Sequence, residues 1–169
     1  MKKFLSCLLV LATLLSSTIS LAAEKNLGFT LESFYTDMNT CLDTLGSLGF
    51  QHYRLELSEK DKENQLVTTP LSMHCSLMIN QGDGMVESIR IVSDEQHGDS
   101  SDDHTVDIIT CFLAAMLLTN SMFTEDNAMT YLNEIVSDHQ EHTYGNVTYR
   151  FGSTAPFSTN VYLDIAPAA

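Results

Sequence analysis

Basic residues are scarce in this chain, and their scarcity restricts the partners that it can bind. The 169 residues include 8 lysines and arginines against 22 aspartates and glutamates, which gives a formal net charge of −14. Such a surface repels phosphate backbones and anionic membranes, so we expect no nucleic-acid binding. The simplest consequence of this charge is solubility. A more specific consequence is attraction to a basic partner or to a divalent cation.

Long hydrophobic runs are also missing. A bilayer with ~30 Å of hydrocarbon needs about 20 apolar residues to span it. The apolar runs at 4–15 and 106–118 are both shorter than that, and the second contains Asp107. We therefore expect 106–118 to be a buried helix. We also expect no stable membrane anchor, because Cys7 lies inside the first run rather than after it, where a lipoprotein cysteine would be.

The first 23 residues have the layout of a secretory signal peptide. Met1-Lys2-Lys3 is a short basic start, 4–15 is the apolar stretch, and Ser20-Leu21-Ala22-Ala23 offers small residues for cleavage. We expect residues 1–23 to be removed and 24–169 to fold as a single exported domain, periplasmic or extracellular, in a bacterium. Without Lys2 and Lys3, six basic and 22 acidic residues remain, so the net charge of the mature chain is −16.

Cysteines are few, and the expected export gives them a role. Cys41, Cys75 and Cys111 remain after the leader is removed. In an oxidising compartment we expect one disulfide bond and one unpaired thiol, and the spacing allows all three pairings. Cys111 lies in a strongly apolar stretch, where a free cysteine behaves as a small inert hydrophobe. The preferred pairing is therefore Cys41 with Cys75.

The pattern of apolar residues predicts an α+β fold in the order α-βββ-αα-ββ. Spacings of three and four indicate helices, whereas strict alternation indicates strands that bury one face. One-sided strands joined by short turns, such as the hairpin signal Gly82-Asp83-Gly84, form a mostly antiparallel sheet of about five strands with the helices packed on one face. The expected helices are 31–48, 106–123 and one that begins near Thr124; the expected strands are 50–57, 71–79, 85–92, 146–151 and 161–165, with a charged loop at 58–65.

Four polar side chains are candidates for a binding surface. His52, Arg54 and Glu56 alternate with the apolar residues of strand 50–57, and His74 faces the corresponding way on strand 71–79. If adjacent strands align them, they form a polar patch whose histidines titrate near pH 6–7. The alternative is that they are simply the solvated side of the sheet.

An acidic loop at 94–104 is a candidate cation site. Hard cations take several oxygen ligands from flexible loops, which suggests Asp99, Asp102, Asp103 and His104 as metal ligands. The spacing does not match the twelve-residue calcium loop, however, and the alternative is a solvated loop that caps the next helix. A second cluster, at 138–142, is interpreted as a polar helix terminus rather than a zinc site.

Catalytic motifs are missing as well. The chain has no G-x-S-x-G elbow, no H-E-x-x-H helix and no phosphate-binding glycine loop. Cys75 beside His74 suggests a thiol hydrolase, but neighbours on a strand point to opposite faces, so this histidine cannot activate the sulfur locally. The sequence therefore disfavours an enzyme without excluding one, and no cofactor is expected.

Four segments carry a resemblance that covers about half of the chain. Together they resemble a pattern of small exported bacterial α+β domains of unknown function. The element order also resembles that of secretion-chaperone-like domains, which are small, acidic, often dimeric and cytoplasmic. Neither resemblance implies a reaction. The segments are 82–88, 107–112, 123–126 and 145–149.

The leading hypothesis is a non-enzymatic module that binds a protein or peptide through the exposed face or the edge of its sheet. Edge strands offer unpaired backbone groups, so strand addition is a physical route to binding. One alternative is a divalent-cation-binding protein that uses the loop 94–104, and another is a small hydrolase.

Overall fold

The computed structural model describes residues 25–46, 52–93, 102–124, 127–153 and 160–169, with residues 102–104 described by their backbone alone. The expected signal peptide at 1–23 lies outside these ranges. No helix within them is both long and apolar enough to cross a bilayer.

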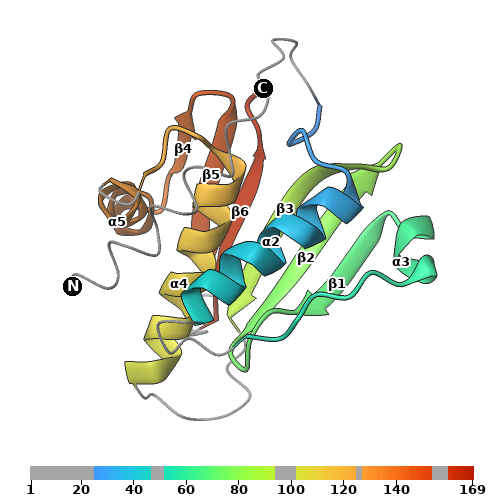
Figure 1. Ribbon diagram of the computed structural model, residues 1–169. Helices are drawn as coiled ribbons and strands as arrows, with labels where there is room; N and C mark the ends of the chain where they lie inside the picture. Colours follow the sequence, from blue (N-terminus) through green and yellow to red (C-terminus); the bar gives the residue numbers. More distant parts are fainter. Residues whose placement is uncertain (1–24, 47–51, 94–101, 125–126, 154–159) are drawn as a thin grey trace.

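The described residues form a six-stranded antiparallel sheet with helices packed against it, which confirms the predicted α+β class (Figure 1). The order of the strands in the sheet is β1-β2-β3-β6-β5-β4. The elements, in chain order, are α2 (Leu31–Gly46), α3 (Glu59–Glu63), β1 (Leu66–Pro70), β2 (Cys75–Gly82), β3 (Met85–Ser93), α4 (Asp102–Thr119), α5 (Ala128–Asp138), β4 (Glu141–Tyr144), β5 (Val147–Ser153) and β6 (Val161–Pro167).

The sheet consists of two antiparallel meanders that meet in its middle. Strands β1 to β3 form the first meander and β4 to β6 the second, and each follows helical structure in the chain. The two are joined where β3 pairs with β6, from Ile89 opposite Ile165 to Val92 opposite Tyr162. The structure therefore contains the same helix-then-meander unit twice, although the sequence shows no repeat.

The hydrophobic core lies between one face of the sheet and the helices α2, α4 and α5 (Figure 1). Alternate strand residues such as Ile79, Ile91 and Leu163 point into it and are fully buried. Helix α4 contacts both meanders: it packs on β2 and β3, and its Phe112 makes an edge-to-face contact with Phe151 of β5. The prediction of a buried, almost wholly apolar helix near 106–123 is confirmed.

Within its described part, residues 52–57, the predicted strand at 50–57 is not formed, and a side chain of α2 takes the place of a strand partner. The buried Asn39 donates from Nδ2 to the carbonyl of Leu55 at 2.9 Å and accepts from the Leu55 N–H at 2.8 Å. A helix side chain therefore supplies the two hydrogen bonds that a neighbouring strand would have made. The alternation of apolar residues is real, but the segment lies off the sheet.

The predicted loop at 58–65 contains the short helix α3. A capping box forms it: the Ser58 hydroxyl accepts from the Asp61 N–H at 3.2 Å, and the Asp61 carboxylate accepts from the Ser58 N–H at 2.9 Å. The Ser58 hydroxyl also donates to the Asp61 carboxylate at 2.6 Å, and this bond, together with that from the Ser58 N–H, holds the pKa of Asp61 below its usual value. The Gln81 side chain then ties α3 to the sheet by donating to the Asp61 carbonyl at 2.7 Å.

Three further parts of the chain differ from the prediction, and the first is strand β1 at Leu66–Pro70, which was not predicted. The chain turns at 71–74, where the N–H of Leu71 donates to the Cys75 carbonyl at 2.8 Å, so β2 begins at Cys75 and Met73 is 58% exposed instead of inward. The edge strand β4 was not predicted because three of its four residues, Glu141, His142 and Thr143, are polar and therefore show no alternation of apolar residues. A left-handed φ of 55° at His139 ends α5 just before β4 begins.

The hairpin predicted at Gly82-Asp83-Gly84 is confirmed, with positive φ at Asp83 and Gly84.

We expect Asn39→Ala to lower the free energy of unfolding by roughly 2–4 kcal/mol, because it leaves both backbone groups of the buried Leu55 without partners. Urea denaturation measures this change. The matched control is Thr40→Ala on the exposed side of the same helix, which should stay within about 0.5 kcal/mol of the wild type. Equal stabilities for the two variants would show that Asn39 does not hold the segment in place.

Candidate functional site

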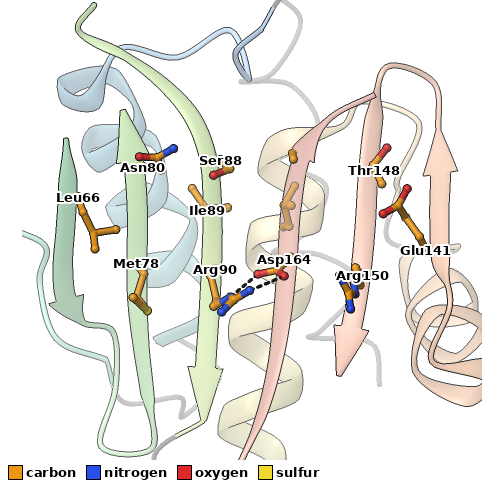
Figure 2. A pocket seen from close by; sticks show the side chains of 12 residues that line it. Leu66, Met78, Asn80, Ser88, Ile89, Arg90, Glu141, Thr148, Arg150 and Asp164 are labelled. Atoms are coloured by element: carbon orange, nitrogen blue, oxygen red, sulfur yellow. Dashed lines mark hydrogen bonds and ion pairs between the residues drawn. The ribbon is translucent and has the colours of Figure 1, made fainter. Parts of the chain in front are cut away.

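The face of the sheet opposite the helices carries a hollow of about 430 Å³ (Figure 2). Among the described residues, no helix covers this face. Its lining comes from all six strands, and we call it the open-face groove. The residues that line it are Leu66, Met78, Asn80, Ser88, Ile89, Arg90, Glu141, Thr148, Arg150, Asp164, Ile165 and Ala166.

The antiparallel register places five of these residues in one row across the sheet. Met78 of β2 lies opposite Arg90 of β3, which lies opposite Asp164 of β6. Arg150 of β5 lies opposite Asp164 on the other side, and Glu141 of β4 completes the row. Because side chains alternate along each strand, all five project from the open face. The row therefore begins with an apolar side chain and continues with charges of alternating sign.

The centre of the row is a fixed ion pair. Arg90 donates from Nε to Oδ1 of Asp164 at 2.5 Å and from Nη2 to Oδ2 at 2.8 Å, so both carboxylate oxygens are engaged. The hydrogen bond to Asp164 raises the pKa of Arg90. The Arg90 guanidinium also lies 4.5 Å from the centre of the Tyr162 ring, a cation–π distance. Arg90 is thus held in place on two sides.

The position of Tyr162 depends on a glycine in the neighbouring strand. Gly152 of β5 lies opposite Tyr162 of β6, and a Cβ atom on Gly152 would come within 2.6 Å of the Tyr162 hydroxyl oxygen. Only glycine leaves room for the ring to lie along the sheet. The missing side chain at Gly152 therefore lets Tyr162 reach Arg90 and support one wall of the groove.

Arg150 is the available cation of the groove. It is exposed, and within the described part of the chain it makes no ion pair, although Asp164 and Glu141 flank it in the register. Arg90 already occupies both oxygens of Asp164. A guanidinium presents several N–H donors in a planar fork that matches a carboxylate. Arg150 can therefore receive an acidic group from a ligand.

A second polar cluster lies between α5 and β4, away from the groove. His142 Nε2 is 2.9 Å from Asp138 Oδ1, and this hydrogen bond holds the pKa of Asp138 below its usual value. The Tyr144 hydroxyl is 3.4 Å from His142 Nδ1 and donates to Glu134 at 3.1 Å. Burial raises the pKa of Tyr144 to about 12. The phenol keeps its proton at neutral pH, so this chain of hydrogen bonds supplies no nucleophile.

The four residues predicted as a binding surface do not form one sheet face. His52 Nε2 and Arg54 Nη1 lie 3.2 and 3.6 Å from the Asp43 carboxylate of α2, on the helical side. Glu56 is exposed on the same segment, which lies off the sheet. His74 is 9% exposed in the turn before β2. The strand alignment that the prediction assumed is absent because Asn39, and not a strand, pairs with the segment.

The predicted cation ligands fall mostly outside the described structure. Asp99 lies in an undescribed segment, and for Asp102, Asp103 and His104 only the backbone of the first turn of α4 is described. Within the described residues, no three histidine, cysteine, aspartate or glutamate side chains gather as a metal site would require. Cation binding by the loop 94–104 stays a prediction, which calorimetry with calcium and zinc would test.

The three cysteines described by the structure are free, buried thiols, so the preferred Cys41–Cys75 bond is not present. The Cys41 thiol contacts the Ala114 carbonyl of α4 at 3.9 Å, and burial raises its pKa to about 12. The Cys111 thiol of α4 interacts with Cys75 of β2, and this interaction, together with burial, raises the pKa of Cys111 well above its ordinary value. Sequence spacing could not reveal this, since it carries no information on which element covers which strand.

The groove residues were missed as a site, although part of their signal was visible. Alternation in 71–79, 85–92 and 161–165 marks Met78, Arg90 and Asp164 as outward-facing. What the sequence does not show is that β3 and β6 are neighbours. Without that pairing, Arg90 and Asp164 are two unrelated charges 74 positions apart.

Comparison with known protein families, with curated proteins and with solved structures finds no match to this chain. The shape and the charges of the open-face groove are therefore the observations on which a function has to be built.

We expect Gly152→Ala to destabilise the protein by about 1–3 kcal/mol, because the new methyl group displaces the Tyr162 ring. The test is a double-mutant cycle measured by urea denaturation. In a Tyr162→Ala background there is no ring to displace, so the same glycine substitution should have less than half that effect. An equal effect in both backgrounds would mean that Gly152 serves only the backbone of β5.

Proposed function

We propose that this chain is an exported, non-enzymatic binding module that holds a segment of a partner polypeptide in the open-face groove. The observation that carries the proposal is the groove itself. It is a hollow on a sheet face that none of the described helices covers, and it is lined from six strands by a row with an apolar end and alternating charges.

The dimensions favour a polypeptide over a compact small molecule. Neighbouring strands lie about 4.8 Å apart, so a path across six strands is roughly 24 Å long. An extended chain rises about 3.3 Å per residue, and about seven residues therefore match this length. Figure 2 shows the lining side chains spread across the sheet from Leu66 to Glu141, which suits an extended segment of a larger partner.

The chemistry of the groove specifies what such a segment carries. Leu66 and Met78 offer apolar contact at the end formed by β1 and β2. Arg150, near the opposite end, is free to take a carboxylate. The segment that fits therefore has an apolar side chain at one end and an acidic side chain, or a terminal carboxylate, several residues away. Because the whole chain is strongly acidic, the rest of the partner is neutral or basic.

The face of the sheet is favoured over its edges. Strand β1 is five residues long and ends in Pro70, which has no N–H to offer, and β4 has four residues. Short edge strands and proline are the means by which proteins discourage strand addition. Binding therefore uses side chains on the open face instead of unpaired backbone groups.

The arrangement of the groove supports the non-enzymatic part of the proposal. No histidine lines it. The carboxylate of Asp164 is engaged by Arg90, and the Thr148 hydroxyl is 3.0 Å from that of Thr143. A hydroxyl nucleophile needs an adjacent base that is free to take its proton. The alternative of a thiol hydrolase is disfavoured because Cys75 is only 1% exposed, on the opposite face.

A peptide-display selection tests the proposed function. A library of twelve-residue peptides is selected against the protein, and the affinities of the enriched peptides are measured by fluorescence polarisation. We expect peptides that share one acidic position and an apolar position several residues away. Arg150→Gln should weaken them about tenfold, which is about 1.4 kcal/mol for one charge-assisted contact.

Two matched variants make the test specific. Arg54→Gln removes another exposed arginine, outside the groove, and should leave the affinity unchanged. Glu141→Gln removes the negative charge opposite Arg150 and should tighten binding about twofold. If no peptide is enriched, or if the enriched peptides bind Arg150→Gln as well as the wild type, the groove is not the binding site.

A further inference from the structure

Residues 52–64, which we call the strap, run outside the sheet as a coil that leads into α3 (Figure 1). Separate contacts hold the strap in place of a strand ladder. At its start, the Tyr53 N–H donates to the Leu71 carbonyl at 2.7 Å. In its middle, Asn39 of α2 makes both hydrogen bonds of the Leu55 backbone. The strap is therefore fastened at points along its length, and each point depends on a few hydrogen bonds.

The far end of the strap is fastened to β2 by the side chain of Gln81. Its Nε2 donates to the carbonyls of Asp61 and Asn64, at 2.7 and 2.6 Å. Within the strap, Leu55 is the only buried residue, and most of the others are exposed. Segments with few buried apolar contacts open at a lower free energy than the core of a protein. The strap has this character, whereas the strands beside it do not.

On the side of α2 that faces the strap lies a buried phenol. Tyr35 is 3% exposed, and its enclosed hydroxyl has no hydrogen-bond partner among the residues that the structure describes. It precedes Asn39 by one helical turn, so the two side chains share a face of α2. Burial, and then the negative charge of Asp61, raise the pKa of Tyr35 to about 12. The hydroxyl therefore keeps its proton at neutral pH and is a donor without an acceptor.

We infer that the strap opens as a unit while the rest of the fold stays intact, and that the enclosed Tyr35 hydroxyl favours this opening. In the closed state the hydroxyl has given up its hydrogen bonds to water, which raises the free energy of that state. In the open state water reaches the hydroxyl again. The inference is independent of the proposed function, since no strap residue lines the open-face groove.

The tyrosine makes the strap a conformational device instead of a fixed cover. A phenylalanine would fill the same space without enclosing an unpaired hydroxyl. With the tyrosine, the closed and open states lie closer in free energy, so the open state is more often populated. Opening exposes the Leu55 side chain and the face of α2 that carries Tyr35 and Asn39. This surface on the helical side is thus available only while the strap is open.

Hydrogen exchange of single amides, followed by NMR on the purified protein, tests whether the strap opens by itself. The N–H groups of Tyr53 and Leu55 report on the strap because each donates to a partner outside it. Those of Ile89 and Ile91 report on the central strand β3. We expect the strap amides to exchange about a hundredfold faster or more, and their rates to change little in dilute urea, because local opening exposes little surface. Equal rates in strap and strand would overturn the inference, since the strap would then open only when the whole domain unfolds.

A matched pair of variants tests the role of the Tyr35 hydroxyl. Tyr35→Phe should slow exchange of the strap amides about tenfold, because the closed state no longer encloses an unpaired donor. The control is Tyr149→Phe, at a second buried tyrosine whose hydroxyl is 3.0 Å from Thr119 Oγ1. This control should leave exchange in the strap unchanged. Unchanged or faster exchange in Tyr35→Phe, or equal slowing in both variants, would contradict the assigned role.

Discussion

The pairing of β3 with β6 is the constraint on which the rest of the structure depends. It joins two meanders that are far apart in the chain, and it does so over four residue pairs. On the inner side it makes one continuous apolar surface, so that α4 can pack on both meanders at once. On the outer side it brings Arg90 to Asp164 and makes the open-face groove continuous across six strands. Core and groove are two consequences of the same junction.

The two sides of the sheet carry ionisable side chains of different kinds. The inner side holds Cys41 and Tyr149, and burial raises the pKa of both side chains because it disfavours their charged forms. The outer face holds two of the few arginines of an acidic protein, one locked in an ion pair and one available.

Local hydrogen bonds decided the elements where the periodic pattern was misleading. Asn39 replaces a strand partner for Leu55, and the capping box at Ser58 turns a charged loop into a helix. Both depend on single side chains whose partners are one turn or one layer away. An alternation of apolar residues indicates that one side of a segment is buried, but it does not indicate which group forms the hydrogen bonds of its backbone.

The sequence by itself determined the α+β class, the one-sided strands, the central buried helix, the hairpin at Asp83-Gly84 and the strong negative charge. These follow from periodicity, turn chemistry and composition, which are local properties of the chain. Only the tertiary structure decided that β3 neighbours β6, and that Arg150, which makes no ion pair with the residues that the structure describes, lies beside an Asp164 already bound by Arg90. Such contacts join residues between 14 and 76 positions apart, from Arg150 with Asp164 to Ile89 with Ile165. They are set by how the layers pack together, which no local pattern encodes.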